Sequence, residues 1–218
     1  MIFNFLLRYP DEIIVNSIDL KKEVDKEFSI KSKCIFNPLN KTKILRSKKN
    51  KKNLFNAKKK TLKILFLGRL VDQKDPFNFL RAINRIPDKI EFKSLIIGSG
   101  YMKEDILEFI RNNNLENKLS HLDYTQKAMQ YLNQTDLFVL SSKYEGLPNV
   151  LLEAQFLKKY IISTDCPTGP REILLGGKAG TLIKVNNPEI LKKKIIEFYK
   201  SGKTMNYKKK IALGYKEL

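Results

Sequence analysis

The sequence is poor in the residues that build metal centres and disulfide frameworks. Its 218 residues include two cysteines, one histidine and no tryptophan. Cys34 and Cys166 are far apart and form no CxxC pair, which is typical of reduced thiols in a cytosolic protein. With these residues alone no zinc site is predicted. We expect His121 to be a packed or surface residue rather than a catalyst.

Several segments that would anchor a protein or bind phosphate are also missing. No apolar run reaches the roughly 18 to 20 residues of a membrane-spanning helix. Residues 1–7 are apolar but lack a basic region and a cleavage site, so no secretory signal is predicted. The phosphate-binding pattern GxxxxGK[ST] does not occur. Gly98 and Gly100 start a dinucleotide-binding pattern, but Lys103 stands where its third glycine belongs. Asp-x-Asp does not occur either, so the usual metal clamp for a diphosphate is not predicted.

Positive charge is what the composition has in excess. The chain has 42 Lys and Arg against 23 Asp and Glu, a formal net charge of +19. Residues 41–60 and 192–218 together carry +17 of it, which leaves the remaining chain nearly neutral. Clustered lysines fit either an anionic membrane surface or a solvated loop and tail, and the sequence leaves both open. A nucleic-acid binder is the weaker interpretation, because no DNA- or RNA-binding motif is present.

Short apolar runs alternate with helical patterns from residue 61 onward. The runs predict strands over 62–67, 93–98, 118–122, 136–141, 160–164 and 180–185. The segments between and after them predict helices over 76–86, 103–112, 126–134, 148–158, 171–175 and 188–201. Near-continuously apolar strands separated by helices indicate an α/β fold with a doubly wound, Rossmann-like parallel sheet.

The chain before this sheet has a different organisation. Residues 12–17 and 33–38 are two strand-like runs that flank a charged helix, which predicts one β-α-β unit, too small to be a domain. We therefore divide the chain into 1–40, a lysine-rich linker or loop over 41–60, and a sheet domain over 61–218.

Ligands of such sheets bind beyond the carboxyl ends of the strands, so the residues that follow each strand are the candidates for function. After the strand at 136–141, Glu145 lies in a loop and Glu153 in the next helix. The backbone amides of 146–150 gather near that helix N-terminus, where they favour phosphate or sugar oxygens. After the strand at 62–67, Arg69 and Lys74 can both reach one anionic group. Together these residues predict a nucleotide diphosphate joined to a polyol and bound without a metal ion.

Four segments, taken in order, resemble the C-terminal domain of retaining GT-B glycosyltransferases of family 4. They are GRLVDQKDPFNFLRAI, LIIGSG, DLFVLSSKYEGLPNVLLEA and DCPTGPREILLGGKAGTLI. The resemblance covers roughly residues 61–201. It extends to the 12–17 and 33–40 segments, which look like the end of the family's N-terminal domain and the crossover. On this resemblance, most of the family's acceptor-binding N-terminal domain is not in the chain, and residues 1–40 are its remnant.

The resemblance implies a role for each site residue. Arg69 and Lys74 would hold the donor diphosphate, Glu153 the ribose and Glu145 the hydroxyls of the donor sugar. The backbone of the loop after Glu145 would complete the site, at Gly146, Leu147, Asn149 and Val150. Residues 121–126 would frame the base, although Asp123 stands where many relatives have glycine.

The function that this resemblance implies is sugar transfer. We expect a retaining, metal-independent transferase that uses a nucleotide sugar, UDP-sugar first, and a glycan or lipid-linked acceptor in cell-surface polysaccharide synthesis. Glu145, Arg69 and Lys74 are the expected catalytic residues, with no cofactor besides the donor. The expected location is the cytoplasm, at the inner face of the membrane if the basic segments bind it. A separate chain could supply the N-terminal domain. The alternative is a non-catalytic nucleotide-sugar-binding module or partner subunit.

Overall fold

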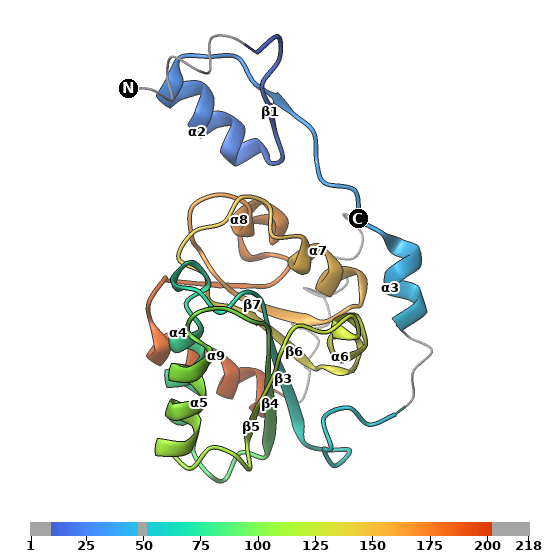
Figure 1. The fold of residues 1–218 in the computed structure, drawn as a ribbon, viewed down its shortest axis with the longest axis vertical. Coiled ribbons are helices and arrows are strands. Elements are labelled where there is room, and N and C mark those ends of the chain that lie inside the picture. Colours follow the sequence, from blue (N-terminus) through green and yellow to red (C-terminus); the bar gives the residue numbers. More distant parts are fainter. Residues whose placement is uncertain (1–9, 48–51, 202–218) are drawn as a thin grey trace.

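A six-stranded parallel sheet is the centre of the computed structural model, which describes residues 10–47 and 52–201 (Figure 1). The strand order is β5-β4-β3-β6-β7-β8, and every neighbouring pair is parallel. The strands are β3 (Leu62–Leu67), β4 (Phe92–Ile97), β5 (Leu119–Leu122), β6 (Leu137–Leu140), β7 (Tyr160–Thr164) and β8 (Thr181–Ile183). The predicted doubly wound fold is confirmed.

Helices follow the strands and cover both faces of the sheet. They are α4 (Pro76–Asn84), α5 (Lys103–Asn112), α6 (Ala128–Gln134), α7 (Asn149–Phe156), α8 (Pro170–Ile173) and α9 (Pro188–Lys200), with short 3-10 turns η1 (Asp72–Lys74) and η2 (Leu175–Gly177). Of the predicted elements, β3, β7 and α5 have the expected bounds. The other strands and α-helices of the sheet domain differ by one or two residues at an end.

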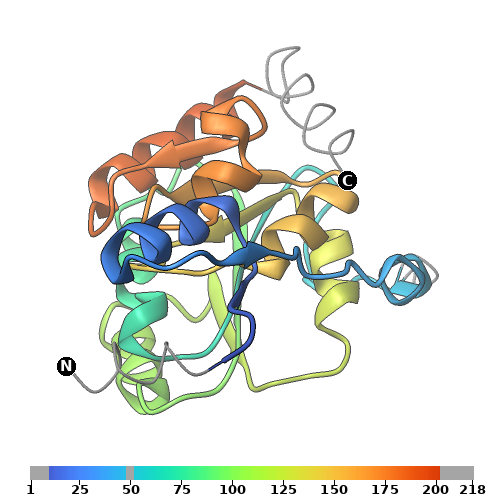
Figure 2. The same cartoon turned by 90° about the horizontal axis from the view of Figure 1, so that it is seen from above.

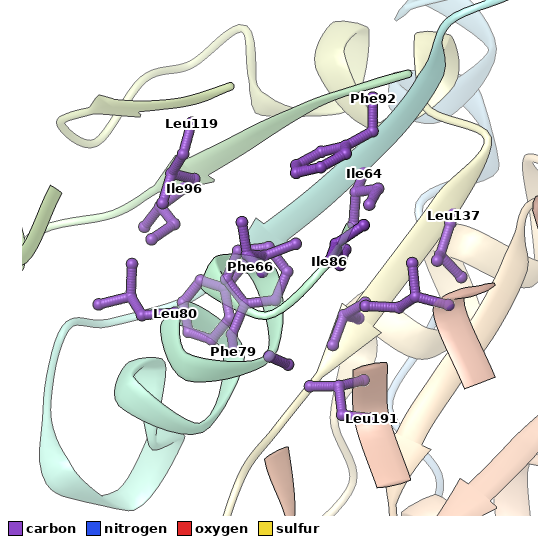
Figure 3. Packing of buried hydrophobic residues seen from close by; sticks show 14 of the residues in the cluster. Ile64, Phe66, Phe79, Leu80, Ile86, Phe92, Ile96, Leu119, Leu137 and Leu191 are labelled. Carbon is purple, nitrogen blue, oxygen red and sulfur yellow. The ribbon is translucent and has the colours of Figure 1, made fainter. Parts of the chain in front are cut away.

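The core has one layer on each face, because successive side chains of a strand point to opposite sides. In β3, Ile64 and Phe66 belong to the cluster under α4, α5 and α9, where Phe79 and Leu191 also pack (Figure 3). Leu65, between them, belongs to the opposite cluster under α6 and α7. Each of these side chains is at most 1% exposed, so the strands are buried on both faces as their continuous apolar runs require.

The predicted β-α-β unit precedes the sheet domain. It consists of β1 (Ile14–Val15), α2 (Ile18–Phe28) and β2 (Lys33–Cys34), with β1 and β2 parallel. Ser17 caps α2 by accepting a hydrogen bond from the Leu20 amide. The unit lies over α7 and α8 (Figures 1 and 2). The Glu172 carboxylate of α8 accepts hydrogen bonds from the amides of Ile18 and Asp19, so α8 supplies a second cap to α2.

Part of the expected linker is helical. Residues 41–47 form α3 (Lys41–Ser47), which packs against α6 and lies at the side of the sheet domain in both Figures 1 and 2. Ile44 is 1% exposed, and Phe55 further along is also buried, with its ring edge against Tyr131. These two apolar side chains fix the stretch to the domain despite its lysines. Residues 48–51 and 202–218 of the basic segments lie outside the described residues.

Candidate functional site

The loops after β3 and β6 meet at the carboxyl edge of the sheet because those two strands are neighbours. The β3 loop holds Arg69 and Lys74, and the β6 loop holds Glu145. Gly98, after the next strand, allows the edge to close tightly. A Cβ atom on Gly98 would lie 1.8 Å from the Gly68 carbonyl oxygen. Only glycine lets the two strand ends approach this closely.

Lys74 and Glu145 form an ion pair between these two loops. The Lys74 Nζ lies 2.5 Å from the Glu145 Oε1, and the side chains are only 16% and 6% exposed. The Ser142 hydroxyl donates to the same oxygen at 2.6 Å. Within the described residues, Oε2 of Glu145 accepts no hydrogen bond. The carboxylate is therefore fixed through one oxygen, and the other is available to a ligand hydroxyl.

The β6 loop is also held by the last residue of β7 and by the loop that follows it. Thr164 Oγ1 donates to the Ser142 carbonyl at 2.6 Å, and the Thr168 hydroxyl donates to the Glu145 carbonyl. Gly169 has φ +78, and a Cβ there would lie 2.0 Å from the Gly146 carbonyl oxygen. The loop that presents Glu145 is thus fixed at its backbone as well as at its carboxylate.

Arg69 is exposed and lies in the same loop as Lys74. Its Nη2 donates to the Gln73 side-chain oxygen at 2.9 Å. The Gln73 amide in turn donates to the Tyr144 carbonyl at 3.1 Å. Within residues 10–47 and 52–201, Arg69 has no carboxylate partner. Its positive charge is therefore available to an anion.

The backbone of 146–150 leads into α7, whose first residue is Asn149. The Leu147 side chain is buried in the core under α7, so this residue can offer only its backbone to a ligand. The Asn149 side chain accepts a hydrogen bond from Asn37 of the crossover at 2.9 Å. This backbone therefore lies at a helix N-terminus, where partial positive charge favours anions.

Glu153 lies one turn into α7 and is partly buried. Desolvation raises the pKa of its carboxyl above 4.5, and Lys43 of α3 partly opposes the shift. Its carboxylate has neither a hydrogen bond nor an ion pair in the described part of the chain. A partly buried acid that has no such partner costs stability and is typical of a ligand-binding group.

A cavity of about 370 Å³ opens beside Arg69 at the ends of β3, β4 and β5. Its lining includes Gly98, Ser99, Tyr124 and Thr125. Tyr124 is 78% exposed, and its amide donates to Ser99 Oγ at 3.1 Å. This is the region where the sequence predicts the base.

Asp123, the residue that departs from the family pattern, points to Lys103. The Lys103 Nζ lies 2.9 Å from its carboxylate, and this contact holds the pKa of Asp123 below its ordinary value. A weaker contact from Ser99 Oγ, at 3.4 Å, adds to it. The acid is thus neutralised beside the cavity rather than facing a ligand unpaired.

The β-α-β unit approaches the same loops from above. Asn16, directly after β1, places its buried Oδ1 about 3.6 Å from where a Cβ on Gly146 would lie. A second cavity, of about 540 Å³, lies between the crossover and α7–α8, with Phe36, Leu147 and Ile173 in its lining. The β-α-β unit and the crossover therefore form one wall over the 146–150 loop.

The remaining reactive side chains, His121 and the two cysteines, have surroundings that suit a structural role. His121 contacts the Gly98 carbonyl at 2.9 Å through Nε2, which fits its expected packing role. Both cysteines are free, and burial raises the pKa of the Cys166 thiol to about 11, so it is not a nucleophile at neutral pH. In the described part of the chain no three His, Cys, Asp or Glu residues could jointly hold a metal ion. No described helix is long and apolar enough to cross a membrane.

The structure brings the predicted residues to one edge, and it adds contacts that sequence reasoning missed. Arg69, Lys74 and Glu145 lie in adjoining loops, and Glu153 lies in the helix that follows. The direct pairing of Lys74 with Glu145 was not predicted, nor was the bridge through Gln73. Gln73 stands between the two predicted cations in the sequence, which is the one signal that pointed to it.

Comparison with known proteins places the chain in a family. A model of the family described as Glycosyl transferases group 1 matches residues 47–213. An uncharacterized glycosyltransferase of Methanocaldococcus jannaschii is 34% identical over 178 residues, 79% of this chain and 44% of the relative. A Campylobacter jejuni N-acetylgalactosaminyltransferase that acts on a diphospho-undecaprenol-linked sugar is 29% identical over 98% of this chain and 56% of its own length.

Solved structures share the fold at low identity. A Rickettsia africae glycosyltransferase matches with TM-score 0.82 and 19% identity, over 94% of this chain and 57% of that one. Anabaena HepE, in complex with UDP, matches with TM-score 0.81 and 16% identity, over 96% and 59%. The fold is the Rossmann-like C-terminal half of a GT-B glycosyltransferase. This chain spans about half the length of the curated relatives it matches. The chain belongs to the group 1 glycosyl transferases.

Proposed function

We propose that this chain is the donor-binding half of a glycosyltransferase that takes a sugar from a nucleotide-sugar donor in cell-surface glycan synthesis. The observation that carries the proposal is the arrangement at the carboxyl edge of the sheet. This arrangement consists of a largely buried Lys74–Glu145 pair, the N-terminus of α7, and Arg69, which has no acidic partner among the residues that the structure describes. Two cations and a row of amides suit a diphosphate, and the two acids suit sugar hydroxyls.

Each residue then has a role set by its surroundings. Arg69 and Lys74 bind the diphosphate, with Arg69 offering a planar fork and Lys74 a compact charge. Glu145 Oε2 accepts from the donor sugar, and Glu153 accepts from the ribose diol. The ribose hydroxyls would supply hydrogen bonds to the Glu153 carboxylate, which receives none from the described part of the chain. The cavity beside Tyr124 would hold the base, and UDP is the first candidate nucleotide.

The reaction breaks the bond between the sugar and the leaving phosphate. Negative charge grows on that phosphate in the transition state, and two fixed cations stabilise it without a metal ion. We assign no protein nucleophile. The retaining stereochemistry of family 4 fits this assignment, with the acceptor attacking on the face that the leaving phosphate occupies and that phosphate assisting deprotonation.

The acceptor belongs to the other half of the site. We propose a glycan or lipid-linked acceptor, which is supported by relatives whose names specify diphospho-undecaprenol-linked sugars. Residues beyond this chain's half would position it, either from the same polypeptide or from a separate one. The β-α-β unit above the 146–150 loop is where the two halves would join.

Isothermal titration calorimetry tests the donor site. The folded chain, in EDTA, is titrated with UDP, GDP and ADP, and Arg69→Ala serves as the site variant. We expect binding of UDP or GDP by the wild type and a loss of about tenfold in Arg69→Ala, because a charge-assisted contact to phosphate is removed. Heat from none of the three nucleotides, or equal affinity of the variant, would count against the proposal.

A further inference from the structure

We infer that Gln73 is a positioning residue that orients Arg69 for the donor diphosphate while leaving its charge intact. This inference rests on the proposed function, since it assumes that Arg69 meets a phosphate. It concerns one side chain that bridges the two loops of the site. Gln73 and the Tyr144 carbonyl that it contacts in the other loop are both neutral.

Gln73 has one contact within the β3 loop, to Arg69, and two contacts that link this loop to the β6 loop. Its side-chain oxygen accepts from Arg69 Nη2 at 2.9 Å, and its side-chain nitrogen donates to the Tyr144 carbonyl at 3.1 Å. Its backbone carbonyl accepts from the Lys143 amide at 2.8 Å. Gln73 therefore connects the Arg69 guanidinium to the backbone of Tyr144, the residue just before Glu145. If one loop moved relative to the other, the orientation of Arg69 relative to the β6 loop would change.

The charge balance of the two loops explains why an amide suits this position. Three described cations lie there, and two of them have acidic partners. Lys74 pairs with Glu145, and Lys143 pairs with Asp72 at 2.5 Å. Arg69 alone is held by a neutral group. Its five N–H donors lose one to Gln73, which leaves the rest of the fork for an anion.

A carboxylate at position 73 would have the opposite effect. Glutamate could still accept from Arg69, but it would neutralise the guanidinium and compete with the phosphate for it. It would also have no N–H to donate to the Tyr144 carbonyl. The choice between glutamine and glutamate at this position thus decides whether Arg69 is a restrained cation or half of a third ion pair.

The experiment is a double-mutant cycle in calorimetric affinity for UDP and GDP, in EDTA. The variants are Gln73→Met, Gln73→Glu, Arg69→Ala and the double variant Arg69→Ala with Gln73→Met. Methionine keeps the length of the side chain without its hydrogen bonds. Asp72→Asn is the matched control, because it breaks a link between the same two loops without contacting Arg69. Thermal unfolding of each variant checks the fold.

The expected pattern separates orientation of Arg69 from support of the loop. Gln73→Met should weaken binding about fivefold, the effect of one hydrogen bond. Gln73→Glu should weaken it about tenfold or more, because it adds a competing charge. In the Arg69→Ala background, Gln73→Met should have less than about a twofold effect, since its target is gone. Asp72→Asn should bind nearly as the wild type does.

Two results would overturn the inference alone. One is wild-type affinity in both Gln73 variants while Arg69→Ala is weakened. The other is an equal loss from Gln73→Met with and without Arg69, which would make Gln73 a support for the loop. Failure of the wild type to bind either nucleotide would instead overturn the proposed function, and this inference with it.

Discussion

Replacing Glu145 with glutamine probes the ion pair that joins the two loops of the site. Glu145→Gln keeps the size of the side chain and an oxygen that can accept from Lys74 and Ser142. It removes the negative charge that lies 2.5 Å from the Lys74 ammonium. The Lys74 charge, on a side chain only 16% exposed, then has no carboxylate partner at that position.

The size of the effect follows from this burial. Removing one partner of a buried ion pair costs about 3–5 kcal/mol, because the other charge stays desolvated. The amide oxygen of glutamine retains the hydrogen bonds, so we expect about 2 kcal/mol of lost unfolding free energy. For a domain of this size that corresponds to a melting temperature about 4–8 °C lower.

Differential scanning calorimetry at neutral pH measures the melting temperature of Glu145→Gln, with Asp72→Asn as the control. The Asp72–Lys143 pair joins the same loops, but Asp72 is 64% exposed and Lys143 39%, so its loss should be less than half as large. Equal melting temperatures for Glu145→Gln and the wild type would refute the claim that the Lys74–Glu145 pair is a stabilising contact of the site.

Three further predictions follow from individual residues. Glu153→Gln should weaken UDP or GDP binding in calorimetry yet raise the melting temperature at pH 7. The desolvated carboxylate adds no cost below its unfolded pKa near 4.5, and the cost grows as the pH rises from there through the higher folded-state pKa. Unchanged nucleotide affinity would contradict its binding role, and a lower melting temperature would contradict the cost of its burial. Gly98→Ala should lower the free energy of unfolding in urea by at least about 2 kcal/mol, since the added Cβ would collide with the Gly68 backbone. Gly176→Ala is the matched control, because its Cβ would have no atom within 4 Å. It should lower the free energy of unfolding by about 1 kcal/mol, from the positive φ of +62 alone. Replacing the exposed lysines of 52–60 with glutamine should reduce co-sedimentation with anionic vesicles at low salt and leave nucleotide affinity unchanged. If sedimentation of the wild type does not depend on vesicle charge, these lysines do not bind the membrane.

Much of the sheet could be predicted because its strands are short apolar runs with clear ends. The run at 62–67 is β3 and the run at 160–164 is β7, with the same bounds. The helix α3 could not be predicted, since its seven residues are mostly polar. Isolated helices this short are not stable in water, so α3 depends on the burial of Ile44 against the domain.

The site could be predicted as a set of residues but not as a set of contacts. The rule that parallel strands end at one edge brings 68–75 and 141–149 to the same side. It does not state that β3 and β6 are neighbours, because their order depends on how the chain crosses the sheet. The Lys74–Glu145 pair joins residues 71 positions apart and follows from that order. The sequence therefore assigned the two side chains separate roles, whereas the fold couples them.

A crystal structure of this chain with the nucleotide that calorimetry identifies is the most direct test of the donor site. We predict that the diphosphate lies between Arg69, Lys74 and the first amides of α7, that the ribose hydroxyls donate to Glu153, and that the base occupies the cavity beside Tyr124. A nucleotide bound elsewhere, for example against the lysines of 52–60, with the carboxyl edge of the sheet empty, would contradict the account.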